Sequence, residues 1–351
     1  MLCLGDFVTT RTPRGHIKHD KSGVLHRFGM DDAGTASLLL DLAESRAFPD
    51  FTVAYFGDND YRSHEVGPHA ALPVIDRVDA ALGAMFEASG GFDAFMRDTC
   101  VIVTSDHGHC EILADRKGSA VHLDELLGDF TQARLGLAWR EGEEIMICPN
   151  MRAAQIYLRH PAAEQATRLA RAALTDGRVD QVMWLRSLTE GGGAPGYVAV
   201  TGRGRLDFWR ADGAGVSSAA AEQARDGYGG TWAWKGDLEA LGMERDGSDL
   251  GSATYPNAFE RIAGALDARN GGDIWVTAQP GCEFEVTGGD AHTAGASHGA
   301  LHALDSLSPV IVAGLGRRLP RAMRSIDIAS LCLELLGLSI SEPQLEVGSM
   351  R

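Results

Sequence analysis

Helical patterns alternate with short apolar runs near the start of the chain, and this alternation constrains the fold more than any other feature. The Leu-rich residues 36–43, with Thr35 as the expected N-cap, precede the β-rich run 51–56. Apolar residues at helical spacing between 75 and 86 then precede a second apolar run at 100–104. Strands joined by a helix are typical of parallel pairing. The sequence therefore predicts an α/β fold, with a mostly parallel sheet sandwiched by helices.

The middle of the chain has a different texture. Residues 153–208 carry strand, helix and hairpin patterns, and the stretch that follows them is small, polar and glycine-rich. Core texture returns with a predicted helix at 257–268, strands at 273–277 and 309–312, and a terminal helix at 328–336. We therefore expect three segments, namely a first part of the α/β core at 1–144, a smaller inserted α+β cap unit at 145–250, and a second part of the core at 251–351.

The charge balance excludes one class of partner. Among 351 residues, 32 Lys plus Arg stand against 48 Asp plus Glu, which gives a formal net charge of −16. Long-range repulsion of that sign opposes binding along a nucleic-acid lattice. A small anionic substrate can still bind, provided that something positive and local holds it.

Cysteine usage and hydropathy bear on the compartment. Six cysteines lie far apart without a C-x-x-C pair, so we expect reduced thiols rather than a disulfide framework. No apolar run approaches the roughly 18 residues of a membrane span, and no signal-peptide core opens the chain. As written, the chain is expected to be cytoplasmic; a secreted or periplasmic location follows if the true N-terminus lies upstream.

Carboxylates and imidazoles gather where predicted strands end. Asp60 and His64 follow the run at 51–56, Asp106 and His107 follow the run at 100–104, and His298 lies shortly before the strand at 309–312. Open α/β sheets place their sites at such ends. Mixed carboxylate and imidazole ligands suit Zn²⁺, with Mn²⁺ as the harder alternative, and a pair of ions can clamp a phosphoryl group. We therefore expect a metal centre.

For other polar residues near these motifs, a structural role has to be weighed against a functional one. A single histidine at a strand end is more often a hydrogen-bonded turn residue than a ligand. For His109 the packed or solvated turn is the favoured reading, and a residue behind the metal ligands is the alternative. His292, six residues before His298, is a candidate extra ligand or substrate contact. Asp305 and Ser306 are expected to shape the loop after His298 rather than to take part in chemistry.

Three motifs in this order resemble the alkaline phosphatase superfamily, specifically its type I phosphodiesterase/nucleotide pyrophosphatase branch. They are Asp60-x-x-x-His64-x-x-Gly-Pro, Thr104-Ser-Asp-His-Gly108 and Ser297-His-Gly299. The resemblance covers roughly 31–125 and 255–340. It implies a hydrolase acting on phosphoric esters with a small phosphorylated substrate and two divalent ions. One ion would be held by Asp60, His64 and His298, and the other by Asp106 and His107.

The resemblance also implies two features that we do not find in the sequence. Family members have a first strand ending in a metal-binding Asp and, further on, a Ser or Thr nucleophile at a helix start. Thr35 is better explained as an N-cap, and nothing singles out Thr9, Thr10 or Ser63. The catalytic nucleophile is therefore unassigned, and the first core part is expected to be N-terminally incomplete. The alternatives are an inactive homologue that still binds metal and a phosphomutase-like member of the superfamily.

Overall fold

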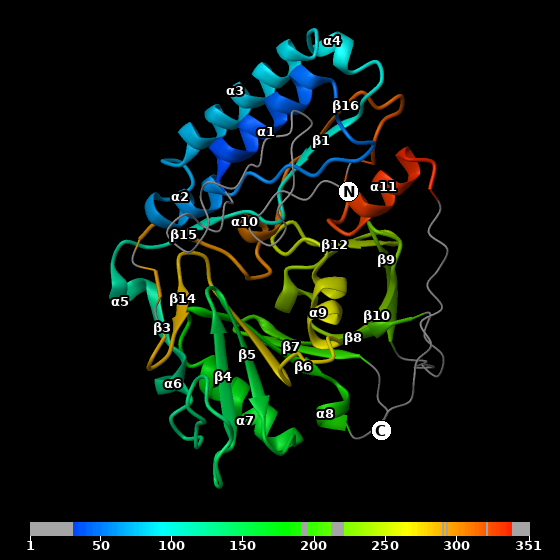
Figure 1. The fold of residues 1–351 in the computed structure, drawn as a ribbon. Coiled ribbons are helices and arrows are strands. Elements are labelled where there is room, and N and C mark those ends of the chain that lie inside the picture. The colour runs from blue at the N-terminus through cyan, green and yellow to red at the C-terminus, as the bar shows by residue number, and fades with distance from the viewer. Residues whose placement is uncertain are drawn as a thin grey trace. The chain divides into compact units, whose positions relative to one another are not determined.

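The computed structural model describes residues 31–190, 196–211, 221–289, 291–292, 294–320 and 322–338. The chain divides into two compact units, each assembled from separate segments (Figure 1). The first unit is drawn from Met1–Tyr55, Ala81–Ile102 and Val312–Arg351, and the second from Phe56–Ala80 and Val103–Ile311. All the candidate metal ligands belong to the second unit.

The first unit is mainly helical in its described part. Helix α1 (Asp32–Ser45), helix α4 (Phe92–Phe95) and helix α11 (Asp327–Leu335) lie in it, and helix α3 (Leu72–Ala88) enters it from the second unit. The predicted terminal helix is confirmed. The predicted N-cap of α1 is wrong, because Asp31 accepts a hydrogen bond from the Gly34 amide at 2.8 Å. Thr35 lies inside the first turn, and its hydroxyl donates to the Tyr55 carbonyl at 2.8 Å.

Of the two apolar runs near the N-terminus, only the second forms a strand. Strand β1 (Val101–Thr104) confirms the second run, and it pairs with strand β16 (Val310–Ala313) in a two-stranded sheet. The first run, Phe51 to Phe56, belongs to no strand of the described chain, so that prediction is wrong. Val53 in this run is 77% exposed. Strand propensity reflects fit to a half-buried sheet surface, and without neighbouring strands it does not produce a strand.

The second unit is built on a ten-stranded sheet. Its spatial order is β11-β12-β9-β10-β8-β7-β6-β13-β5-β4, and every neighbouring pair is antiparallel except β12 and β9. The strands are β4 (Ile145–Asn150), β5 (Ala153–Leu158), β6 (Val179–Leu185), β7 (Tyr197–Thr201), β8 (Gly204–Arg210), β9 (Glu222–Asp226), β10 (Thr231–Gly236), β11 (Glu244–Asp246), β12 (Asp249–Gly251) and β13 (Ile274–Ala278).

The α/β class is confirmed, but the mostly parallel pairing is not found in this sheet. Two-residue connections join β4 to β5 and β7 to β8, and such short turns permit only antiparallel neighbours. Strands β5 and β6, joined by helix α7 (Ala163–Ala173), run in the same direction as a crossover requires. They are not neighbours, because β13 lies between them and is antiparallel to both. The local sequence pattern around β5 and β6 does not indicate that β13, which is distant in the sequence, lies between them.

Helices cover both faces of this sheet. Along β6, Val182 and Trp184 belong to the apolar cluster that includes α7, whereas Met183 between them belongs to the cluster of helix α9 (Ala258–Leu266). This alternation is the period of two expected of a strand buried on both faces. Most strands come from 145–251 and one from 274–278, and the boundaries of the inserted cap unit stay a prediction.

Smaller elements complete the second unit. Strands β2 (Cys110–Glu111) and β15 (Ala296–Ser297) pair antiparallel, and strands β3 (Ala120–His122) and β14 (Glu283–Glu285) pair parallel. The remaining helices are α2 (Asp58–Val66), α5 (Arg116–Ser119), α6 (Leu123–Leu126), α8 (Ser187–Glu190), the 3₁₀ helix η2 (Leu238–Leu241) and α10 (Ala303–Ser306).

The structure bears on two sequence expectations, the reduced cysteines and the absence of a membrane-spanning segment. The five cysteines within the described ranges are all free thiols. Across the same ranges, no helix combines the length and the apolar character needed to cross a bilayer.

The aromatic packing of α9 against the sheet gives a stability prediction. Phe259 is 2% exposed, and its ring stacks on Phe208 at a centroid distance of 4.2 Å. We expect Phe259→Ala to lower the free energy of unfolding by about 3–5 kcal/mol, because truncation leaves a cavity in a buried cluster. The control Leu137→Ala, at a 47% exposed position, should change it by less than about 0.5 kcal/mol. Urea unfolding measures both, and equal effects would contradict this packing.

Candidate metal centre

Helix α2 places Asp60 and His64 on one face. The two residues are four positions apart, so their side chains lie one turn from each other, and His64 Nε2 is 3.6 Å from Asp60 Oδ1. We expected them in a loop after a strand, whereas the structure has them on a short helix. The four-residue spacing serves the same purpose there, because it presents a carboxylate and an imidazole to one point.

The pairing of β2 with β15 brings two distant histidines together. Ser297 lies opposite Cys110 in this antiparallel ladder. The next residue outward on each strand is therefore His298 on one side and His109 on the other. Their rings are nearly parallel, with centroids 5.2 Å apart. His107 lies two residues further out, and its ring stacks on His298 at 3.6 Å.

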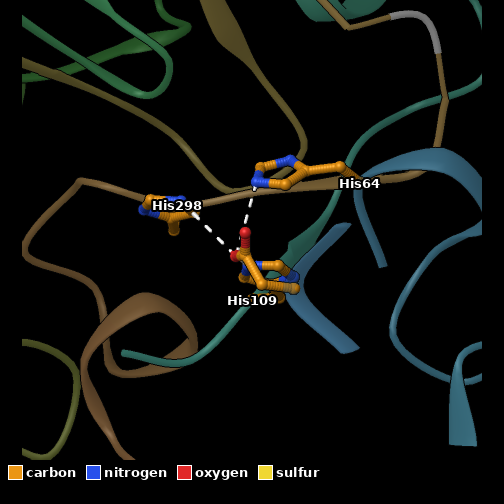
Figure 2. Close-up of side chains that lie close together, drawn as sticks. His64, His109 and His298 are labelled. Atoms are coloured by element: carbon orange, nitrogen blue, oxygen red, sulfur yellow. Dashed lines mark hydrogen bonds and ion pairs between the residues drawn. The ribbon is translucent and has the colours of Figure 1, made fainter. Parts of the chain in front are cut away.

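These side chains converge on one carboxylate oxygen, and Figure 2 shows His64, His109 and His298 pointing toward a common centre. The distances to Asp60 Oδ1 from the four Nε2 atoms are 2.9 Å for His109, 3.6 Å for His64, 3.8 Å for His107 and 4.0 Å for His298. Asp60, His64, His109 and His298 each offer a ligand atom within 4.8 Å of the others. In the described part of the chain, this group has the composition of a metal site.

The hydrogen bonds of the outer ring nitrogens fix two tautomers. His64 Nδ1 lies 2.7 Å from the Ala296 carbonyl, and His107 Nδ1 lies 3.1 Å from the Gly108 carbonyl. A carbonyl oxygen only accepts, so in the neutral imidazoles each Nδ1 carries the hydrogen and each Nε2 presents a lone pair. Backbone carbonyls that orient histidines in this way are typical behind metal ligands.

His109 has the opposite arrangement. Its Nε2 atom lies within hydrogen-bond distance of the Asp60 carboxylate, and the side chain is 8% exposed. The imidazole therefore donates Nε2–H to the carboxylate and orients it. The favoured sequence reading of His109 was a packed or solvated turn residue, and the structure places it in direct contact with Asp60. The β2–β15 register produces this contact, and the sequence carries no signal of that pairing.

The site holds little positive charge of its own. Burial, together with the neighbouring imidazoles, lowers the pKa of His298 to about 4. Burial also lowers the pKa of His64. The hydrogen bond from His109 lowers the pKa of the Asp60 carboxyl below its ordinary value. At neutral pH the ionised Asp60 carboxylate therefore lies beside the neutral imidazoles of His64 and His298, and a cation between them would stabilise this arrangement. That donor chemistry fits a divalent metal ion.

His292 lies at the edge of this cluster. Its ring stacks on His64 at 4.7 Å, and its Nδ1 atom is 3.0 Å from the carboxylate of Glu283, which is 2% exposed. A buried carboxylate thus orients His292 so that its other ring nitrogen stays free. The Asp106 side chain, unlike the carboxylate of Glu283, is 80% exposed. Its Oδ2 atom lies 3.7 Å from His107 Nε2.

A glycine controls the distance between α2 and β15. Gly295 has φ +76°, and a Cβ atom built on it would lie 1.9 Å from the His64 carbonyl oxygen. The backbones therefore approach more closely than any side chain permits. This approach places the Ala296 carbonyl against the His64 ring.

The fold and site together define the class of protein: an α/β protein with a histidine-rich candidate metal centre. The chain belongs to the type I phosphodiesterase/nucleotide pyrophosphatase family, whose model matches residues 6–190, just over half of its length. The resemblance to this branch of the alkaline phosphatase superfamily is thereby confirmed.

Curated relatives match a shorter segment. The chain is similar to 2,3-bisphosphoglycerate-independent phosphoglycerate mutases from Campylobacter jejuni strain RM1221 and from Wolinella succinogenes. Each is 37% identical over 70 residues, which is 20% of this chain and 13% of the relative. The same enzyme from Campylobacter jejuni serotype O:2 is 34% identical over 87 residues, 24% of this chain and 17% of the relative. The chain thus spans less than a fifth of the length of these relatives.

The close approach at Gly295 is testable by overpacking. We expect Gly295→Ala to lower the free energy of unfolding by about 1–3 kcal/mol more than Gly136→Ala, because its methyl group must displace the α2 backbone. Gly136 is a matched control, since it has φ +74° and no heavy atom within 4 Å of a built Cβ. The two variants share the strain of a positive φ and differ in the clash. Equal destabilisation in urea would show that the α2–β15 approach is looser than described.

Proposed function

We propose that this protein is a metal-dependent hydrolase of phosphoric esters, a phosphodiesterase or phosphatase with two divalent ions. One observation carries the proposal: the Nε2 atoms of His64, His107 and His298 lie within 4.0 Å of the Asp60 carboxylate, and a divalent cation between these groups would satisfy their lone pairs. Imidazole and carboxylate ligands suit Zn²⁺, with Mn²⁺ as the alternative. Family membership supports phosphoryl transfer as the reaction class.

The ligand assignment is the one that the family resemblance implies. Asp60, His64 and His298 would hold one ion, and Asp106 with His107 would hold the second. When bound, such ions polarise a phosphoryl oxygen and neutralise developing negative charge. The protein fixes the ligands, as the carbonyls of Ala296 and Gly108 orient the two imidazoles and His109 orients Asp60. His292, oriented by Glu283, is left to contact the substrate or to serve as an additional ligand.

The nucleophile stays unassigned in this proposal. Thr9 and Thr10 lie outside the described residues. Ser63 adjoins a proposed ligand, but its side chain is buried, at 1% exposure, so no substrate reaches it. The Thr35 hydroxyl is engaged with the Tyr55 carbonyl. The alternative of an inactive homologue that keeps the metal centre is therefore distinguished by turnover rather than by metal content.

A second candidate function rests on the relatives. The curated matches are phosphoglycerate mutases, which favours a phosphomutase-like role for a centre of the same composition. In that case the phosphoryl group would pass to a second hydroxyl of a small substrate rather than to water.

Removing one proposed ligand tests the metal centre directly. We expect wild-type protein incubated with Zn²⁺ and desalted to retain metal, and His64→Ala to retain at least one ion per chain fewer. The matched control is His69→Ala, an exposed histidine five residues away, which should retain the wild-type amount. Metal analysis of the purified proteins measures the difference. Equal metal content in the His64 and His69 variants would refute the assignment.

The reaction class is tested with chromogenic esters. We expect Zn²⁺- or Mn²⁺-dependent hydrolysis of bis-nitrophenyl phosphate or nitrophenyl phosphate, abolished by a chelator and restored by adding the metal back. Loss of a ligand should reduce the rate by a factor of about 10² or more, since each ion supplies several kcal/mol of charge stabilisation. Retained metal with no turnover of either ester would favour the inactive homologue. Transfer of phosphate between hydroxyls without net hydrolysis would favour the phosphomutase.

A further inference from the structure

A buried ion pair lies behind the candidate metal centre. Arg152, in the turn between β4 and β5, is fully buried, and its guanidinium donates to the carboxylate of Asp305 on α10, which is 3% exposed. The same guanidinium donates to the carbonyls of Ala278 at 3.1 Å and Cys282 at 3.3 Å. The pair therefore connects β13, the turn before β14, and α10.

Both partners hold the loop of His298. The second carboxylate oxygen of Asp305 accepts from the amide of Ala300 at 2.7 Å, two residues beyond His298. The backbone amide of Arg152 donates to the His298 carbonyl at 3.2 Å. The loop is thus held at the carbonyl of His298 and again two residues further along the chain.

Asp305 also holds the loop that carries His107 and His109. Its backbone carbonyl accepts from the Gly108 amide at 2.9 Å. A Cβ atom built on Gly108 would lie 2.4 Å from the Leu304 carbonyl, so this loop lies directly against α10 with no room for a side chain. One residue therefore contacts the two loops whose histidine rings stack on each other at 3.6 Å.

The energetics favour a role in positioning over one in stability. A buried ion pair contributes little net stability, because desolvation offsets its attraction, and apolar replacements of both partners are often tolerated. Its hydrogen bonds, however, fix direction as well as distance. Here the guanidinium fixes the Asp305 carboxylate against β13 and the turn before β14, and that carboxylate accepts from the Ala300 amide in the loop of His298.

We propose that Asp305, held by Arg152, is a positioning residue that sets the geometry of His298 and His107 for metal binding. This inference rests on the proposed metal centre. Residues that orient ligands typically change metal affinity by about 10–100-fold when they are replaced.

The test compares metal binding in variants of the full chain. Asp305→Asn leaves the Arg152 charge buried without its partner, so the double variant Arg152→Met/Asp305→Leu accompanies it and removes both charges. The control is Leu169→Ala, which truncates a fully buried residue of α7 in the apolar core. Zn²⁺ affinity is measured by competition with a chromophoric chelator, and coordination geometry by the visible absorption of bound Co²⁺. Circular dichroism and thermal unfolding establish that each variant is folded at the working temperature.

We expect the double variant to bind Zn²⁺ about 10–100-fold more weakly than wild type and to show an altered Co²⁺ spectrum. Leu169→Ala should lower the unfolding temperature while keeping wild-type affinity and spectrum. Wild-type affinity together with a wild-type spectrum in the folded double variant would overturn the inference. Absence of saturable binding by the wild-type chain would overturn instead the proposed function on which the inference rests.

Discussion

The candidate site depends on the Asp60 carboxylate, because four imidazole nitrogens from three separate segments lie within 4.0 Å of its Oδ1 atom. Neutral imidazoles and an ionised carboxylate are mutually repulsive acceptors wherever Nε2 presents its lone pair. His109 relieves part of this repulsion by donating a hydrogen bond. The Nε2 lone pair of His64, 3.6 Å from the same oxygen, makes no such hydrogen bond in the described chain, which is why we propose a cation at this point. The close approach of the backbones at Gly295 holds α2 against β15, and a buried Arg152–Asp305 ion pair lies next to the loop of His298.

Short strands and close backbone contacts bring segments that are far apart in the sequence to the Asp60 carboxylate. Two-residue strands β2 and β15 would be negligible as stabilising elements, yet their register decides that His298 faces His109. Glycines at 108 and 295 permit backbone approaches that a methyl group would block. The large sheet supplies rigidity in another way, since it is buried on both faces and carries Arg152 in one of its turns. Precision at the site therefore derives from the backbone packing of loops on a stiff support.

The sequence predicted several of the longer helices and strands of the described chain, because their periodic patterns are local, and it missed most of the short ones. The helix α9 and the strand β13, for example, appear within one or two residues of the expected ranges. What it could not predict is pairing between distant segments. No local pattern indicates that β13 lies between β5 and β6. The run at 51–56, which we expected to form a strand parallel to the run at 100–104, formed no strand. The same distinction between local patterns and distant pairing applies to the site. Asp60 and His64 were evident from their spacing, whereas the contact of His109 with Asp60 required a ladder that no local pattern encodes.

The charge of the chain acquires a different meaning once the site is known. A formal net charge of −16 opposes extended polyanions. Two divalent ions would place about four positive charges inside one cluster of loops, where short distances and partial burial make them outweigh distant surface carboxylates. The low pKa of His298 keeps this imidazole neutral at neutral pH, so the ring itself adds no positive charge to the cluster. On the proposed function, an acidic surface around such a centre would favour small phosphorylated molecules over nucleic-acid lattices, because a small molecule can enter the centre without lying along the surface.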